Sequence, residues 1–216
     1  MNFKCAWVAG ALILTGPAFG VTVNITDFTF TPAADVSTTG TPSHSGPAGQ
    51  YKGNLDGAPF TAYCAELEQG FLFNVDYEYT RMTAAAHFGA QKSNDLSRLF
   101  TATNGWVHDA STAGAMQAAV WEVVHEMGSA YNLTSGTFTM SPTGAGDTSN
   151  FAMFNSVLGN LNSYGPDLDV DVLHNPYYQD MIPVPSIPEP GTWALLVAGL
   201  GVVGLLSRRR SAARND

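Results

Sequence analysis

The sequence predicts an α+β fold in which antiparallel strands pack with a helical middle to form one domain between two hydrophobic ends. Short segments before about residue 80 alternate as in β-strands, whereas apolar residues further on recur at helical spacing. Between the hydrophobic ends lie about 160 residues, the size of one compact domain. We therefore expect a single ectodomain over residues 21–182.

Residues 1–20 have the organisation of a secretory signal peptide. Lys4 provides a positive charge, an apolar run follows from Ala6 to Leu14, and the segment ends on the small residues Ala18 and Gly20. The apolar run is shorter than the roughly 20 residues of a membrane-spanning helix. We expect export, with cleavage after Gly20.

The first half of the domain contains strand patterns. Residues 21–30 alternate and then slip before Phe28, which predicts a strand with a bulge. The Ser-, Thr-, Gly- and Pro-rich residues 31–58 are expected to form a long loop. Residues 59–67 and 71–79 predict two strands joined by a tight turn, the second with aromatic and aliphatic side chains at alternate positions.

The second half is mainly helical. Two short helices are predicted at 84–88 and 95–100, and Ser93 or Asn94 would cap the second. A long helix is predicted at 111–127, where Gly128 ends it. A helix at about 150–161 and an edge strand at 167–173 complete the domain.

The C-terminus has three consecutive parts. A Pro-rich linker at 183–191 contains Pro188, Glu189 and Pro190. The uncharged run 192–206 would form a helix of roughly 22 Å, which we interpret as a short transmembrane helix. The remaining tail, 207–216, is expected to be cytoplasmic because it is rich in arginine: Arg208, Arg209 and Arg210.

This order of motif, hydrophobic helix and arginine cluster resembles the PEP-CTERM sorting signal of Gram-negative, exopolysaccharide-producing bacteria. The resemblance implies that an exosortase, a membrane protease-transpeptidase, is a partner. It also implies a transient stay in the inner membrane, followed by release to the cell surface or the biofilm matrix.

The charge of the domain excludes some functions. The whole chain has 9 basic and 18 acidic residues, and residues 21–182 contain four and sixteen, a net charge of −12. Nucleic-acid binding is not expected, because phosphates require clustered Lys and Arg. An acidic polysaccharide would be repelled unless cations bridge the two, whereas an exopolysaccharide that is not acidic stays among the candidate partners.

Two short motifs point to covalent chemistry. Cys64, the one cysteine between the hydrophobic ends, follows Tyr63 on a predicted strand. Gln117 and Trp121 lie one turn apart on the long helix, and therefore on the same side. The motif residues are Tyr63, Cys64, Met116, Gln117, Val120 and Trp121.

This pair of motifs resembles the signature of the thioester domains of bacterial surface adhesins. The resemblance implies that the Cys64 thiol and the Gln117 side chain join with loss of ammonia, and that an amine-bearing target then opens the bond. Tyr63 and Trp121 would shield the bond from water. Its formation requires a polarised Gln117 carbonyl; backbone N–H groups or His87, His108 or His125 are candidates.

Two alternatives remain at this level. Cys64 could be an inert buried side chain in a non-covalent structural or carbohydrate-binding matrix protein. It could also be the nucleophile of a Cys–His hydrolase. In the thioester interpretation the protein is a single-turnover acyl donor and not an enzyme, and no cofactor is required.

No metal site is expected. His125 and Glu126 begin an H-E-x-x-H pattern, but its second histidine position is Ser129. The acids Asp167, Asp169 and Asp171 alternate along a predicted edge strand and are expected to face solvent.

Overall fold

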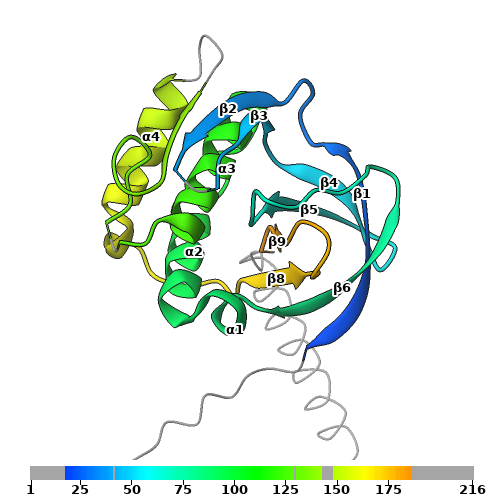
Figure 1. Ribbon diagram of the computed structural model, residues 1–216. Coiled ribbons are helices and arrows are strands. Elements are labelled where there is room, and N and C mark those ends of the chain that lie inside the picture. Colours follow the sequence, from blue (N-terminus) through cyan, green and yellow to red (C-terminus); the bar gives the residue numbers. More distant parts are fainter. Residues whose placement is uncertain (1–17, 41, 129, 143–147, 186–216) are drawn as a thin grey trace, which may run out of the picture. The chain divides into compact units, whose positions relative to one another are not determined.

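The computed structural model describes residues 18–40, 42–128, 130–142 and 148–185 (Figure 1). Most of the expected signal peptide, the linker beyond residue 185, the expected transmembrane helix and the tail lie outside the described residues. Among the helices that are described, none has the length and apolar composition of a membrane span. Cleavage of the signal peptide after Gly20 stays a prediction. Phe19 and Gly20 begin the first strand and pair with Arg81 and Thr80 of a neighbouring strand.

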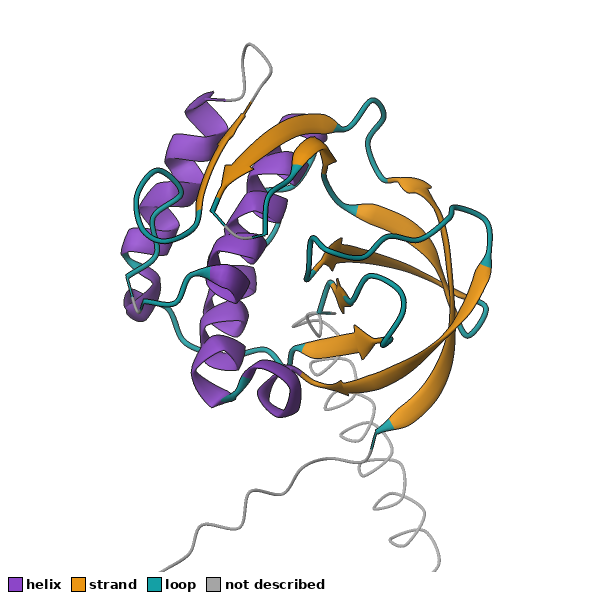
Figure 2. Ribbon diagram, viewed as in Figure 1, coloured by secondary structure: helices purple, strands orange, loops and turns teal. Residues whose placement is uncertain are grey.

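Six antiparallel strands close into a barrel (Figures 1 and 2). In barrel order they are β1 (Phe19–Phe28), β4 (Tyr51–Leu55), β5 (Ala58–Cys64), β9 (Met181–Pro183), β8 (Asp171–His174) and β6 (Asp76–Thr83). Alternate side chains of β1, with partners from the other strands, fill the inside: Val21, Val23, Ile25, Ala62, Tyr79, Leu173 and Met181. The predicted bulge in β1 is confirmed, because its register with β4 shifts between Ile25 and Asp27.

A second sheet has the order β3-β2-β7. Its strands are β2 (Ala34–Thr39), β3 (Ser45–Ala48) and β7 (Thr139–Pro142). The prediction of a long loop over 31–58 is therefore wrong, since that segment contains β2, β3 and β4. Its polar composition suggested a loop, but Val36 is fully buried on β2, and long-range pairing with β7 stabilises the strand.

The helices lie on one side of the barrel (Figure 2). They are α1 (Ala84–Phe88), α2 (Ala90–Ala102), α3 (Ala110–His125) and α4 (Thr148–Gly159), followed by a single 3₁₀ turn at Leu161–Ser163. The α3 helix contacts β2, β3, β5, α2 and α4, and the larger core cluster forms around it. The predicted long helix and the helix near 150 are confirmed; α2 begins earlier than expected, with Gly89 and not Ser93 or Asn94 as its N-cap.

Two predicted strands were misplaced. The aromatic alternation at 71–79 predicted a strand, but β6 begins at Asp76, and β5 pairs with β4 and β9 rather than forming a hairpin with β6. The predicted edge strand at 167–173 contributes only its last residues to β8, which is not an edge, because β6 and β9 flank it. Local alternation does not reveal which strand edges pair. The α+β class itself is confirmed, and the barrel closure is new.

Candidate functional site

Cys64 occupies the last position of β5, where Met181 of β9 pairs with it. Strands β4 and β9 flank β5 on its two sides. The cysteine is 1% exposed and forms no disulfide. The strand therefore fixes the thiol in the interior, at the end of the barrel wall that α3 contacts.

Gln117 is positioned by α3, which starts at a complete capping box: Asp109 accepts the Thr112 N–H at 2.8 Å, and the Thr112 side chain accepts the Asp109 N–H. The helix approaches β2 closely at Gly114, where a Cβ would lie 2.6 Å from the Cβ of Ala34. Gln117 is 1% exposed. A buried side-chain amide on an apolar helix must find polar partners, and it finds them on β5.

The side chain of Gln117 forms two hydrogen bonds with the backbone of Cys64. Its Oε1 accepts the Cys64 N–H at 2.9 Å, and its Nε2 donates to the Cys64 carbonyl at 2.8 Å. The two residues are 53 positions apart in the sequence. These bonds hold the amide group beside the cysteine, and the N–H polarises the amide carbonyl that a thiol would attack.

The thiol of Cys64 is held in its neutral form. Burial raises the pKa of Cys64 to about 12, although a hydrogen bond with Tyr51 acts in the opposite direction. Burial, together with the neighbouring thiol, likewise raises the pKa of Tyr51 far above its usual value. The Tyr51 hydroxyl is therefore protonated at neutral pH and is available to donate a hydrogen bond to the sulfur.

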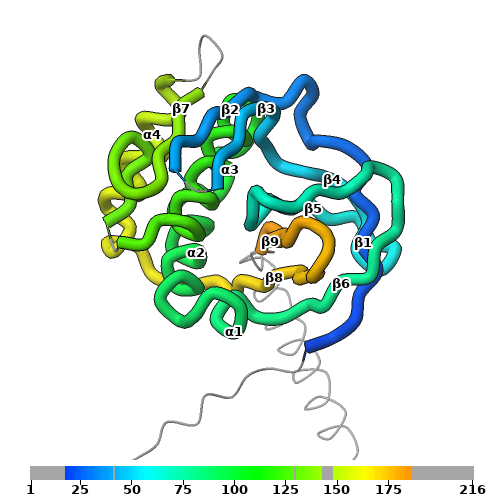
Figure 3. Tube along the Cα trace, in the orientation of Figure 1, coloured from blue at the N-terminus to red at the C-terminus, as the bar shows by residue number. Residues whose placement is uncertain are grey.

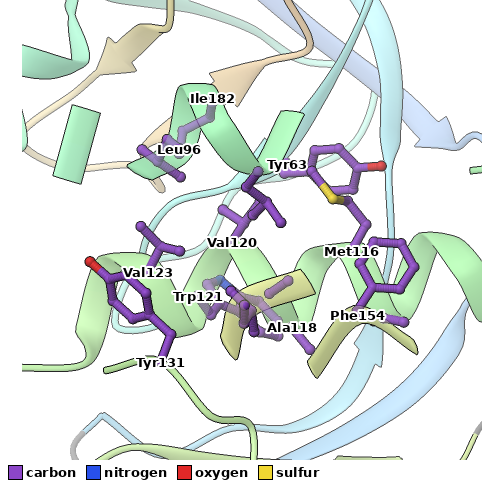
Figure 4. Close-up of a cluster of buried hydrophobic side chains, with 14 of the residues drawn as sticks. Tyr63, Leu96, Met116, Ala118, Val120, Trp121, Val123, Tyr131, Phe154 and Ile182 are labelled. Carbon is purple, nitrogen blue, oxygen red and sulfur yellow. The ribbon is translucent and has the colours of Figure 1, made fainter. Parts of the chain in front are cut away.

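The other motif residues belong to the same buried apolar cluster as Cys64. Figure 4 shows Tyr63, Met116, Val120 and Trp121 within one cluster of buried side chains. The Tyr63 hydroxyl accepts a hydrogen bond from Gln50 at 3.1 Å. All four motif side chains are almost fully buried, which is the water-excluded environment expected from the sequence.

None of the three candidate histidines hydrogen bonds with Gln117 among the described residues. His87 contacts Asp180, and His108 lies at the surface beside Asp109. His125 packs near Phe138, with its pKa lowered by burial. The Gln117 carbonyl instead accepts a hydrogen bond from the backbone N–H of Cys64, and backbone N–H groups were the other kind of donor that the sequence analysis considered.

The sequence analysis missed Tyr51 and the aromatic cluster around it. Tyr51 stacks on Phe28 at a centroid distance of 4.5 Å and meets Phe71 edge-on at 5.3 Å. The segment that follows Phe71 exposes large apolar side chains, with Leu72 69% and Phe73 43% exposed. Tyr51 thus lies between the buried Cys64 thiol and the partly exposed loop Phe71–Phe73. The alternating aromatics at 71–79 are the sequence signal for this cluster, although their spacing predicts a strand.

The acidic residues of the two patterns considered for metal chemistry lie at the surface or have other partners, and Asp167 and Asp169 are exposed. Glu126 accepts backbone N–H groups of Gly128, Thr137 and Phe138. Asp171 pairs with Arg81 at 2.6 Å. Ser129 lies outside the described residues.

Comparison with known proteins identifies the C-terminus. Residues 186–210 match the PEP-CTERM protein-sorting motif, which includes Pro188, Glu189, Pro190 and the arginines Arg208, Arg209 and Arg210. The motif implies an exported protein that an exosortase processes and that is sorted to the cell surface. No curated protein and no solved structure shows significant similarity to the chain.

Proposed function

We propose that the exported domain forms an internal thioester between Cys64 and Gln117 and uses it to attach the protein covalently to amine-bearing molecules at the cell surface or in the biofilm matrix. The observation that carries this proposal is the pair of hydrogen bonds that holds the Gln117 amide against Cys64. The match between these contacts and the two sequence motifs supports it further.

The first step forms the thioester. The Cys64 sulfur attacks Cδ of Gln117, and the carbonyl electrons move to Oε1, where the Cys64 N–H stabilises the negative charge. When the carbonyl re-forms, the C–N bond breaks and Nε2 leaves as ammonia after taking up the thiol proton. One S–C bond replaces one C–N bond, and no oxidant or cofactor is required.

The second step transfers the acyl group. A neutral amine attacks the same carbon, the S–C bond breaks, and Gln117 becomes a substituted amide joined to the target. The thiol of Cys64 is a poor leaving group at its raised pKa, so a proton or hydrogen bond must reach the sulfur. We assign that role to Tyr51, whose hydroxyl hydrogen bonds with Cys64.

The burial of the two site residues and the charge of the domain are consistent with a protein that reacts once. The almost complete burial of Cys64 and Gln117 keeps water from the bond until a partner arrives. The net charge of −12 over residues 21–182 attracts protonated amines toward the surface. Lysines of surface proteins, polyamines and amino sugars of an exopolysaccharide are the amine classes that we propose. The protein reacts once and is not a turnover enzyme.

Intact mass of the purified exported protein tests the proposal. We expect the protein to be lighter than its sequence mass by one ammonia, and methylamine to add at Gln117 and release one titratable thiol. Cys64→Ala and Gln117→Ala should abolish both changes, whereas Gln91→Ala, on the exposed start of α2, should leave them intact. An unmodified mass in correctly folded wild-type protein would refute the thioester.

One pocket favours the non-covalent alternative. A depression of about 520 Å³ is lined by hydroxyl, amide and carboxylate side chains, which are the groups that bind sugar hydroxyls: Thr22, Asn24, Thr26, Asn54, Asn74 and Asp76. If the protein binds matrix polysaccharide here, Asn54→Ala should weaken the binding, with no change in protein mass. The Cys–His hydrolase has no comparable support, because among the described residues no imidazole hydrogen bonds with the Cys64 thiol.

A further inference from the structure

Two histidines and one aspartate converge at the end of the barrel. His87 lies on α1, His174 is the last residue of β8, and Asp180 directly precedes β9. The α1 helix lies beside β8 (Figure 3). Segments almost 90 residues apart in the sequence therefore contribute side chains to one place, so no local motif could announce the cluster.

The ligand-type atoms of this cluster are close together. Oδ2 of Asp180 lies 2.8 Å from Nδ1 of His174 and 3.1 Å from Nε2 of His87. All three atoms lie within 4.8 Å of one another. The Asp180 side chain is almost fully buried, whereas the imidazoles are 22% and 36% exposed, so the cluster is anchored inside and open to solvent on one side.

We propose that His87, His174 and Asp180 form a binding site for a divalent transition metal, with Zn²⁺ as the preferred ion. A tetrahedral zinc bound at about 2.0–2.1 Å keeps its ligand atoms about 3.3 Å apart. The two separations from Oδ2, 2.8 and 3.1 Å, are about 0.5 and 0.2 Å shorter than that value. Two imidazoles with one carboxylate are ligands that suit zinc and its neighbours rather than Ca²⁺ or Mg²⁺, and a fourth position remains for water.

The surroundings of Asp180 orient it for this role. Its Oδ1 accepts the Asn175 N–H at 2.8 Å and also lies 3.0 Å from Nδ1 of His174, so both carboxylate oxygens face that imidazole, and Oδ2 is the one that also reaches His87. The Asp180 backbone N–H donates to Glu66 at 2.9 Å, which fixes the turn.

A bound ion would brace the part of the barrel that holds Cys64. The Asp180 carbonyl accepts the Ala65 N–H at 2.8 Å, and the next residue, Met181, pairs with Cys64. The metal would tie α1 to the β8–β9 turn and through it to the end of β5. An ion that binds the folded state stabilises it by mass action.

A competing account requires no ion, because two neutral imidazoles can each donate a hydrogen bond to the same carboxylate. The experiment therefore measures zinc binding directly, on the exported protein without a histidine tag. We expect equilibrium dialysis with Zn²⁺, followed by elemental analysis, to give one ion per chain, and Ca²⁺ to bind far more weakly. His87→Ala, His174→Ala and Asp180→Asn should each weaken zinc binding at least about 10-fold.

His108→Ala is the matched control, since His108 is an exposed histidine that also lies beside an aspartate, and zinc affinity should not change. A second measurement uses the wild-type protein alone: Co²⁺ should give the intense visible absorption of a tetrahedral site, and Zn²⁺ should displace it. Wild-type protein that takes up no zinc, or triad variants that bind zinc as tightly as His108→Ala, would overturn the proposal. Neither readout depends on the thioester.

Discussion

The α3 helix that positions Gln117 also contains a buried carboxylic acid, and replacing it should stabilise the protein in a pH-dependent way. Glu122 is fully buried; its Oε1 accepts the Asn132 N–H at 2.7 Å, and its Oε2 has no hydrogen-bond partner. Burial, with a smaller contribution from Glu126, raises the pKa of Glu122 to about 7. The change is Glu122→Gln, which keeps an acceptor for Asn132 and removes the charge.

The magnitude follows from the two pKa values of Glu122. A rise from 4.5 to about 7 corresponds to an upper limit of about 3 kcal/mol, at about 1.4 kcal/mol per pH unit. Relaxation and water penetration reduce such values, so we expect about 1–2 kcal/mol. Because the folded state binds the Glu122 proton more tightly, protonation of Glu122 stabilises the fold fully below about pH 4.5, and this stabilisation is lost as the pH rises through about 7. The variant should therefore equal the wild type near pH 4 and exceed its stability at pH 8.

Urea unfolding at pH 4 and pH 8 measures this difference in the free energy of unfolding. Glu126→Gln is the control, because it should lower the free energy of unfolding at pH 8, where Glu122→Gln should raise it. Burial would raise the pKa of Glu126, but hydrogen bonds from Gly128, Thr137 and Phe138 outweigh it and lower the pKa to about 2. That substitution should cost about 2 kcal/mol at pH 8. An equal effect of Glu122→Gln at both pH values, or a loss of stability at pH 8, would refute the reasoning about the buried acid.

Three further predictions concern the thiol, the barrel and the start of α3. In the variant Gln117→Ala, Cys64 stays unmodified, and its alkylation in the native protein should be slow at pH 8 and should accelerate as the pH approaches 12. Thiol titration of the native and the urea-unfolded protein tests this. Equal alkylation rates of the two forms at pH 8 would contradict it. Gly53→Ala should lower the melting temperature strongly, because a Cβ there would overlap the backbone of β1. Gly70→Ala is the control, because its Cβ meets open space and the melting temperature should not change. Equal melting temperatures of the two variants would argue against the β1–β4 packing. Asp109→Ala removes the N-cap of α3 and should cost about 1 kcal/mol in urea unfolding, and an unchanged midpoint would mean that the capping box contributes nothing.

The elements of the candidate site could be predicted because their signals are local. Tyr63 and Cys64 lie on a strand and Met116–Trp121 on a helix, as alternation and helical spacing indicated. The start of α3 at Ala110, after the N-cap Asp109, differs from the expected start at residue 111 by only one residue. By contrast, the aromatic alternation after Phe71 was misleading. A row of apolar side chains is also what an exposed aromatic loop presents, and its pattern does not tell which side meets water.

The sequence by itself determined the C-terminal sorting motif, the α+β class and the residue types of the motifs around Cys64 and Gln117, since each depends on neighbours within a few positions. Only the tertiary structure decided that the Gln117 amide bonds with the Cys64 backbone, that Tyr51 reaches the thiol, and that His87 joins Asp180. These contacts depend on which strands pair to close the barrel and on where α3 packs against it. Hydrophobic periodicity specifies which side of an element is buried, but not which distant element covers it.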